Sequence, residues 1–463
     1  MTPRKTKNAA IRFFTFCTKD DGNMTVVGLF SFIAMAAMGS FALDVSNAYA
    51  SRTHLQTAAD QAAHAALYNR YLMDEQSAKV EALAVVNATL PSTVYGQTIT
   101  AEDIEFGELD DTTGQFIAVP DSLNAVRVQT TFSKARGNAL STYLMKLLGV
   151  DEFDITTLAV YTSYQPGCLS EGFVSEGVVD IQSNNTFSSG FCVHSNTNVS
   201  LSSNNTFEPG TIVSMPDLAD LDLPRSGFKT NDGLETALRS ATMNIRILGR
   251  IDNIIYQHEN PTASYGSYPD PAIAADTPAL PDYLINTTPI RSRFKKVTPA
   301  EIYALDDNSG QGRVHVINCQ GGSGLTIDAS AQPLSDVVII SPCEIKFSSG
   351  SVIENARIIS KSSSADSISS PSGLRVGRND NCAEGGGAQL ITVGGMRFPS
   401  DLQIYGSQLL AKGDISFAAN ASGVQGASLI SGGQISGTSN MNMGLCLQGM
   451  EDNLTISYFR LAG

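Results

Sequence analysis

Residues 24–43 form a run of twenty residues without one charged side chain, flanked by Asp21 and Asp44. A helix of that length is about 30 Å long, which matches the hydrocarbon core of a bilayer. Since a lipid-exposed backbone must satisfy its own hydrogen bonds, a single span can only be helical. The alternatives are a buried helix of a soluble domain and a cleaved signal peptide, whose apolar core is shorter. The length of the run and the helical pattern after it favour a retained transmembrane anchor.

The charges on the two sides of this run predict its orientation. Five cationic residues precede the span, and the only acidic residues before it lie at its edge; the five are Arg4, Lys5, Lys7, Arg12 and Lys19. Positive flanks stay cytoplasmic, so residues 1–23 are predicted to be a cytoplasmic tail and the rest to face outward. The outward part holds 25 Lys and Arg against 43 Asp and Glu, a net charge of −18. This acidic balance argues against nucleic acid as a partner.

The segment after the span predicts a long helix and then a small α+β unit. No glycine or proline occurs between Asp44 and Leu90, and alanine, the best helix former, is frequent there. We therefore expect the membrane helix to continue outward as one rod over residues 23–86. Alternation of apolar and polar residues then predicts strands at 99–106, 115–119, 125–132 and 154–164, and an amphipathic helix at 135–148.

A recurring pattern links the span and the rod to a known family. Its parts are Asp21-Gly22-Asn23, Gly39 in the span, Ala42-Leu43-Asp44 and Leu55-Gln56-x-Ala58-Ala59-Asp60-x-Ala62-Ala63. This pattern resembles the TadE/TadG-like N-terminal module of TadG-like proteins, which belong to the Tad (tight adherence) Flp-pilus assembly system. Residues 126–161 resemble the end of the same module. The residues that match the family motif are Gly22, Asp44, Leu55, Gln56, Ala59 and Asp60.

The resemblance implies a single-pass protein of the bacterial inner membrane that works with other pilus-assembly proteins, without catalysis or cofactor. Two departures from the family pattern qualify it. Related pseudopilins carry a glutamate at the fifth position after the glycine, whereas Val27 stands there, which favours an intact anchor. Residues 44–48 match only the first half of a DxSxS metal motif, so we interpret Asp44 as part of the helix and predict no metal site.

From residue 166 onward the sequence predicts an all-β, parallel β-helix-like domain. The pentapeptide at 183–187, SNNTF, recurs at 203–207, and a period of twenty residues matches one coil of such a solenoid. Equivalent asparagines, Asn184 with Asn204 and Asn185 with Asn205, are expected either to form amide ladders between coils or to be ordinary turn residues. Further short strands are predicted at 337–340, 344–347, 351–353, 356–360, 402–405, 408–410, 414–417, 427–430 and 434–435.

An insertion at 217–310 is expected to interrupt this domain. Residues 233–258 have apolar positions at helical spacing and predict one amphipathic helix, and the proline-rich stretch 260–281 predicts a loop. The sequence leaves open whether the helix caps the β-helix or lies along its side. The predicted organisation is therefore a tail (1–23), a span (24–43), a rod and small α+β module (44–165) and a β-helix (166–463).

Six of the seven cysteines follow the span, as expected of disulfides in an oxidising compartment, and Cys17 precedes it. Two pairs are separated by the same 24 residues, which is one coil plus a small loop. The spacing predicts the disulfides Cys168–Cys192 and Cys319–Cys343, which leaves Cys382–Cys446.

No catalytic motif stands out in the sequence. A β-helix glycan enzyme needs carboxylates on neighbouring coils, and the scattered candidates are Asp180, Asp328, Asp336, Asp414, Arg313 and Arg357. The five histidines show no metal-ligand spacing; they are His54, His64, His194, His258 and His315. We therefore expect a non-enzymatic pilus-assembly or adhesion protein. The alternatives are a carbohydrate-binding adhesin that contacts a surface glycan and a β-helix polysaccharide-active enzyme.

Overall fold

The computed structural model describes residues 23–110, 112–322, 324–437 and 439–462. The tail predicted at 1–23, with Cys17 and Gly22, therefore lies outside the described residues except for its last residue. The chain divides into two compact units. The first ends at Tyr164 and takes back the C-terminal residues from Phe459, and the second is Gln165–Tyr458. The β-helix is thus inserted into the first unit, whereas the sequence predicted that it would continue to the C-terminus.

The span and the rod form one continuous helix, α2 (Asn23–Arg70), but the rod ends earlier than predicted. A separate helix, α3 (Glu75–Thr89), follows and packs against α2. The break occurs because Asp74 is an N-cap: its carboxylate accepts hydrogen bonds from Ser77 N at 3.0 Å and Ser77 Oγ at 2.7 Å. The prediction of a single rod to residue 86 was therefore wrong at this turn.

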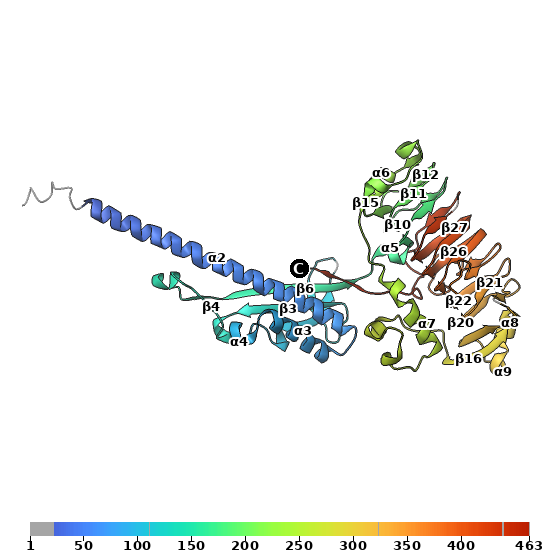
Figure 1. Ribbon diagram of the computed structural model, residues 1–463, viewed down its shortest axis with the longest axis horizontal. Helices are drawn as coiled ribbons and strands as arrows, with labels where there is room; N and C mark the ends of the chain where they lie inside the picture. The colour runs from blue at the N-terminus through green and yellow to red at the C-terminus, as the bar shows by residue number, and fades with distance from the viewer. Residues whose placement is uncertain (1–22, 111, 323, 438, 463) are drawn as a thin grey trace, which may run out of the picture. The chain divides into compact units, whose positions relative to one another are not determined.

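The first unit is completed by a five-stranded sheet against which α2 packs (Figure 1). Its strand order is β2 (Phe116–Ala118), β1 (Ile104–Leu109), β3 (Ala125–Phe132), β6 (Ile155–Tyr164) and β30 (Tyr458–Leu461). The strands β2, β1, β3 and β6 pair antiparallel in that order. The C-terminal strand was not predicted. It lies at the edge of the sheet, where Ala462 N donates to Val160 O at 2.7 Å and the Phe459 ring lies 5.3 Å from that of Tyr71.

The helix predicted at 135–148 is absent, and an extended arm takes its place. The arm contains the 3₁₀ helices η3 (Lys134–Arg136) and η4 (Met145–Leu148) and the two-stranded ladder of β4 (Leu140–Ser141) with β5 (Glu152–Phe153). Gly137 and Gly149 adopt positive φ angles, 69° and 86°, which end helical turns. Asn138 Oδ1 also accepts from Ser133 N at 2.9 Å, so the segment turns instead of continuing as a helix.

The second unit confirms the predicted β-helix-like fold: short parallel strands stack in register to form coils (Figure 1). Its strands before the interruption are β7 (Gly172–Ser175), β8 (Val179–Ile181), β9 (Thr186–Phe187), β10 (Cys192–Ser195), β11 (Val199–Leu201), β12 (Asn205–Phe207), β13 (Ile212–Met215), β14 (Asn231–Asp232) and β15 (Leu238–Ser240). Its later strands are β16 (Asn286–Phe294), β17 (Lys296–Val297), β18 (Arg313–Cys319), β19 (Gly324–Ile327), β20 (Leu334–Ser341), β21 (Glu344–Phe347), β22 (Val352–Ser360), β23 (Ile368–Ser369), β24 (Arg375–Val376), β25 (Ala388–Thr392), β26 (Met396–Ala411), β27 (Ile415–Ser431), β28 (Ile435–Gly437) and β29 (Asn442–Gly444).

The order of the coils in space differs from their order in the chain. The first coil, β7–β9, pairs on one side with β10–β12 and on the other with the last coil, β27–β29. For example, Phe173 lies between Leu429 and Val193. One unbroken stack therefore begins with β16, passes through β27, continues into β7 and ends with β15. The chain enters this stack in its middle, as in a circularly permuted solenoid.

Residues 241–285 return the chain from one end of the stack to the other. They contain η7 (Arg246–Arg250) and α7 (Ile251–Glu259), so the single helix predicted at 233–258 is wrong: β15 occupies part of it and continues the coils. The helix α7 lies along the side of the solenoid against β18 and β20, which answers the question that the sequence left open. The remaining short helices are α4 (Ser92–Tyr95), η2 (Ala101–Asp103), α5 (Gly167–Ser170), η5 (Leu218–Asp220), η6 (Gly227–Thr230), α6 (Leu234–Ala237), η8 (Tyr265–Ser267), η9 (Pro271–Asp276), α8 (Pro299–Tyr303) and α9 (Leu305–Asn308).

The sheet that α7 covers is buried on both faces, and each face carries a row of apolar side chains. One row of side chains fills the inside of the coils and comprises Ile339, Ile358, Leu390, Leu409, Leu429, Phe173 and Val193. The neighbouring row points outward under the return segment and comprises Val316, Ile340, Ile359, Ile391, Leu410, Ile430 and Val174. Burial of both faces explains the near-continuous apolar runs of these strands.

Polar ladders inside the turns hold successive coils together. Asn205 Oδ1 accepts from both the backbone N (3.0 Å) and Nδ2 (2.9 Å) of Asn185, and Asn231 Oδ1 does the same for Asn205. The predicted ladder of Asn185 with Asn205 is therefore present, with Asn231 as an unpredicted third member. By contrast, Asn184 and Asn204 have positive φ angles, 62° and 66°, and are turn residues.

A row of buried hydroxyls crosses the point where the last coil meets the first. Ser195 Oγ donates to Gly177 O at 2.7 Å and Ser431 Oγ donates to Gly413 O at 2.8 Å, in each case to the turn of the preceding coil in the stack. Ser175 makes the equivalent bond to Gly433 O. The same local chemistry therefore joins coils that are adjacent in the chain and coils that are 258 residues apart.

The structure contains both disulfides that the spacing predicts and the third that this pairing leaves. The Cα–Cα distances are 4.9 Å for Cys168–Cys192, 6.2 Å for Cys319–Cys343 and 5.5 Å for Cys382–Cys446. The first two close loops of equal sequence separation, 24 residues. The third connects the loop after β24 to the segment after β29 and spans 64 residues.

Candidate functional site

Four residues of the family motif lie on the face of α2 that packs against the five-stranded sheet: Leu55, Gln56, Ala59 and Asp60. Gln56 Nε2 donates to Asp60 Oδ1 at 2.8 Å and to Leu158 O of β6 at 2.9 Å, so this polar pair links the helix to a strand. The apolar members of this face are fully buried: Leu55, Ala58, Ala59, Ala62, Ala63, Ala66 and Leu67. The small side chains of the alanines let the helix approach the sheet closely. The motif residues on this face therefore serve the packing of the helix on the sheet.

The N-terminal part of α2 has the opposite character. Its apolar side chains are exposed, for example Phe30 at 68% and Phe41 at 59%. Among the described residues this is the one helix long and apolar enough to cross a membrane. Exposed aromatic and aliphatic side chains over about 30 Å suit a lipid environment and would be costly in water. Within the described part of the chain, α2 is therefore the candidate membrane anchor, as its TadE/G-like sequence pattern also suggests.

Asp44, at the end of the apolar run, binds the arm. Its carboxylate accepts hydrogen bonds from the backbone N atoms of Tyr143 (2.6 Å), Leu144 (3.0 Å) and Met145 (2.6 Å). Burial raises the pKa of Asp44, but the three N–H donors outweigh burial and leave its pKa below the ordinary value. Among the described residues, no group of three or more His, Cys, Asp or Glu is arranged to hold a metal ion.

The candidate catalytic residues are not brought together. Lys296 lies 2.7 Å from Asp328 and, with Ser330, lowers the pKa of that carboxyl to about 2. Arg313 pairs with Asp306 at 2.8 Å. The other carboxylates hold separate turns or strands: Asp336 accepts from Gln311 and Asn355, Asp414 accepts from Gln434 N, and Asp180 accepts from Gln182.

Arg357 instead belongs to an outward row of buried polar side chains that sequence reasoning missed. The row comprises Arg357, Gln389, Gln408 and Ser428, which occupy matching positions on successive coils. Gln408 Nε2 donates to Leu454 O at 3.1 Å, and Leu454 N donates to Gln408 Oε1 at 3.0 Å. The row therefore anchors the segments that cover this face. The sequence does contain a signal for this row, because its polar residues stand within otherwise apolar strands.

The side chain of His258, on α7, contacts this row at Arg357. Arg357 Nη1 donates to His258 Nε2 at 2.9 Å, and His258 Nδ1 donates to Ile254 O at 2.6 Å, which is the arrangement of a neutral imidazole. Burial, and then the charge of Arg357, lower the pKa of His258 to about 3. The remaining histidines do not gather at this position; His194 and His315 are buried elsewhere, and His54 is exposed.

This contact predicts acid lability. A histidine whose folded pKa is about 3 and whose unfolded pKa is about 6.5 favours folding above pH 6.5, and that contribution is lost as pH falls toward 3. Going from pH 7 to pH 4.5 should cost roughly 2 kcal/mol through His258. Urea unfolding of the full chain in detergent at several pH values measures the loss. A His258→Gln variant should show a shallower slope, whereas His54→Gln should not, and equal slopes in all three proteins would contradict the assignment.

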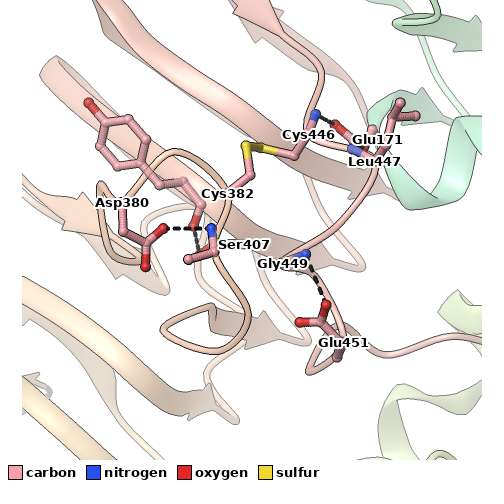
Figure 2. Close-up of a disulfide and its surroundings, with 10 residues drawn as sticks. Glu171, Asp380, Cys382, Ser407, Cys446, Leu447, Gly449 and Glu451 are labelled. Carbon is pink, nitrogen blue, oxygen red and sulfur yellow. Dashed lines mark hydrogen bonds between the residues drawn. A yellow bond between two sulfur atoms is a disulfide. The ribbon is translucent and has the colours of Figure 1, made fainter.

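A cavity of about 370 Å³ lies in the β-helix unit, and its wall includes Glu171 and the residues on both sides of Cys446, Leu445 and Leu447. Figure 2 shows Glu171 beside the chain at Cys446, where its carboxylate accepts from Cys446 N at 2.6 Å and Leu447 N at 2.5 Å. Burial raises the pKa of Glu171, and the two N–H donors offset part of that rise. The cavity wall also includes Glu451, whose carboxylate accepts from Gly449 N, and Asn453, whose buried side-chain amide has no hydrogen-bond partner among the residues that the structure describes.

Comparison with protein families assigns the two parts of the chain to two families. Residues 22–73 match the putative Flp pilus-assembly TadE/G-like family, and residues 172–447 match a domain of unknown function, DUF7867. No curated protein and no solved structure matches the chain. The TadE/G-like match covers the span and the motif face of α2, and the DUF7867 match covers almost all of the coils. Since the second match covers more than half of the chain, the protein belongs to the DUF7867 family and carries an N-terminal TadE/G-like pilus-assembly domain.

Proposed function

We propose that this protein is a non-enzymatic, membrane-anchored component of a Tad/Flp-type pilus assembly system. On this proposal it presents a disulfide-bonded β-helix on the outer side of the bacterial inner membrane. The observation that carries the proposal is the coincidence of the TadE/G-like match with α2, whose first part is lipid-compatible and whose second part packs on the sheet. The basic residues before the span and the six disulfide-bonded cysteines after it support the outward orientation.

The chemistry of the β-helix supports a structural role. Parallel coils offer an enzyme a row of outward side chains, and here the outward polar row containing Arg357 and Gln408 is buried beneath covering segments. Each candidate carboxylate is engaged in a separate turn or ion pair. A carbohydrate-binding role is the alternative, and the cavity lined by Glu171 and Asn453 is the place where we would expect a small polar ligand on that alternative.

Loss of pili after deletion of the gene tests the proposed role. Pili, counted by electron microscopy, and surface attachment should both be lost and should return with the native chain. They should not return with Ala59→Phe, because Ala59 is fully buried between α2 and the sheet. Thr57→Phe is the matched control, since Thr57 is exposed two residues away. Immunoblots establish that each chain is present in the membrane.

The orientation is tested on the same strains with a membrane-impermeant maleimide. Cys17 should be labelled only after permeabilisation, whereas a cysteine introduced at exposed Val80 should be labelled in spheroplasts without it. Normal pili in the deletion strain would overturn the pilus role. Labelling of Cys17 from outside would overturn the orientation, and turnover of a polysaccharide by the purified chain would overturn the absence of catalysis.

A further inference from the structure

The arm between β3 and β6 extends away from the sheet and back along α2 (Figure 1). The ladder of β4 with β5 forms its stem, where Leu140 pairs with Phe153. The 3₁₀ helix η4 (Met145–Leu148) forms its tip and contacts α2. The arm therefore carries its tip toward the part of the helix that holds the apolar run.

The tip is apolar and uncovered. Tyr143 is 60% exposed, Leu147 78% and Leu148 62%, which equals or exceeds the exposure of Leu43 in the span, 57%. Lys146 is also exposed between these residues. Exposure of such an apolar cluster to water is unfavourable, so the cluster indicates a surface that contacts an apolar partner.

Asp44 fixes the position of the tip along the axis of α2, next to the end of the span. Its carboxylate accepts from the backbone N atoms of residues 143, 144 and 145, and Asp44 is the residue that directly follows the apolar run. On the next turn of α2 after Asp44, Tyr49 is also exposed, at 68%. Tyrosine and lysine beside leucine form the composition that favours the boundary between headgroups and acyl chains.

We propose that residues 143–150 are a second, non-spanning membrane contact that inserts into the interfacial layer of the leaflet from which α2 emerges. Leu147 and Leu148 enter the acyl boundary, Tyr143 lies at headgroup level, and Lys146 extends to the phosphates. The lipid surface is the occupant because the contact is continuous with the span through Asp44. This inference rests on the membrane anchor and not on the pilus role. It gives the first unit two contacts with the bilayer, so the unit cannot rotate freely about the axis of α2.

Fluorescence quenching in lipid nanodiscs tests this contact. The full chain with Cys17→Ser and Leu147→Cys carries a bimane probe, and each disc of phosphatidylethanolamine and phosphatidylglycerol holds one copy. Brominated acyl chains should quench the probe several-fold more than they quench the same probe at Val80→Cys, and aqueous iodide should show the reverse order. Val80 is the matched control because it is an exposed aliphatic residue, at 55%, on α3 of the same unit.

A second variant tests the positioning role of Asp44. Asp44→Ala removes the acceptor of three backbone N–H groups, so the probe at position 147 should lose most of its quenching by brominated lipid and become accessible to iodide. Strong iodide quenching at position 147 in the chain with native Asp44 would overturn the proposal. Protection from both quenchers would also overturn it, because the tip would then be covered by protein. Unchanged quenching in the Asp44→Ala chain would overturn the positioning role.

Discussion

Replacing Phe173 with alanine is expected to lower the free energy of unfolding of the β-helix by about 3–5 kcal/mol. The side chain is fully buried, and its ring packs edge-on against Phe191 at 5.1 Å and Phe417 at 5.6 Å. It also lies in the coil that joins the two runs of the stack, between Leu429 and Val193. Alanine leaves a cavity that neighbouring coils cannot fill without losing their backbone register.

Urea unfolding of the full chain in detergent, followed by circular dichroism, measures this loss. Phe228→Ala is the matched control, because Phe228 is 42% exposed and its truncation should change stability by no more than about 0.5 kcal/mol. If the two variants unfold at the same urea concentration, the first coil does not stack against the last one in solution. The permuted order of the coils would then be wrong.

Removing the disulfide Cys382–Cys446 by a double serine substitution should cost about 4 kcal/mol. It closes the longest loop of the three, 64 residues, and the loss of chain entropy in the unfolded state grows with loop length. The shorter loop of Cys168–Cys192, with a separation of 24, should contribute about 3.5 kcal/mol by the same reasoning. The measurement is the same unfolding experiment under oxidising conditions, with Cys17→Ser as the control. A smaller loss for the long loop than for the short one would contradict the entropic account.

Features that depend on local sequence could be predicted. The uncharged run predicts the span, the period of twenty predicts the coils, and equal cysteine spacing predicts two disulfides. The ladder of Asn185 with Asn205 follows from the same repeat. In each case the residues that interact lie one structural repeat apart, so the pattern in the chain contains the contact.

Features that depend on distant pairing could not be predicted. Ser175 bonds to Gly433 O, and His258 meets Arg357 across 99 residues, with no repeat to connect them. The arm was interpreted as a helix because apolar residues at 135–148 have helical spacing, although Gly137 interrupts that segment. The candidate carboxylates could be named from the sequence, but their separate engagement in turns and ion pairs depends on partners that no repeat in the chain connects.

The permuted order of the coils also determines the order in which parts of the β-helix can fold. Synthesis produces the N-terminal coils first, and the second side of β7–β9 is covered only when residues 427–444 have been made. Contacts across such a separation close late and slow the final step of folding. In a chain truncated before residue 427, Phe173 would be exposed to solvent on the side where Leu429 now lies. The stack can therefore be completed only after almost the whole polypeptide has been synthesised, so an incomplete chain cannot form it.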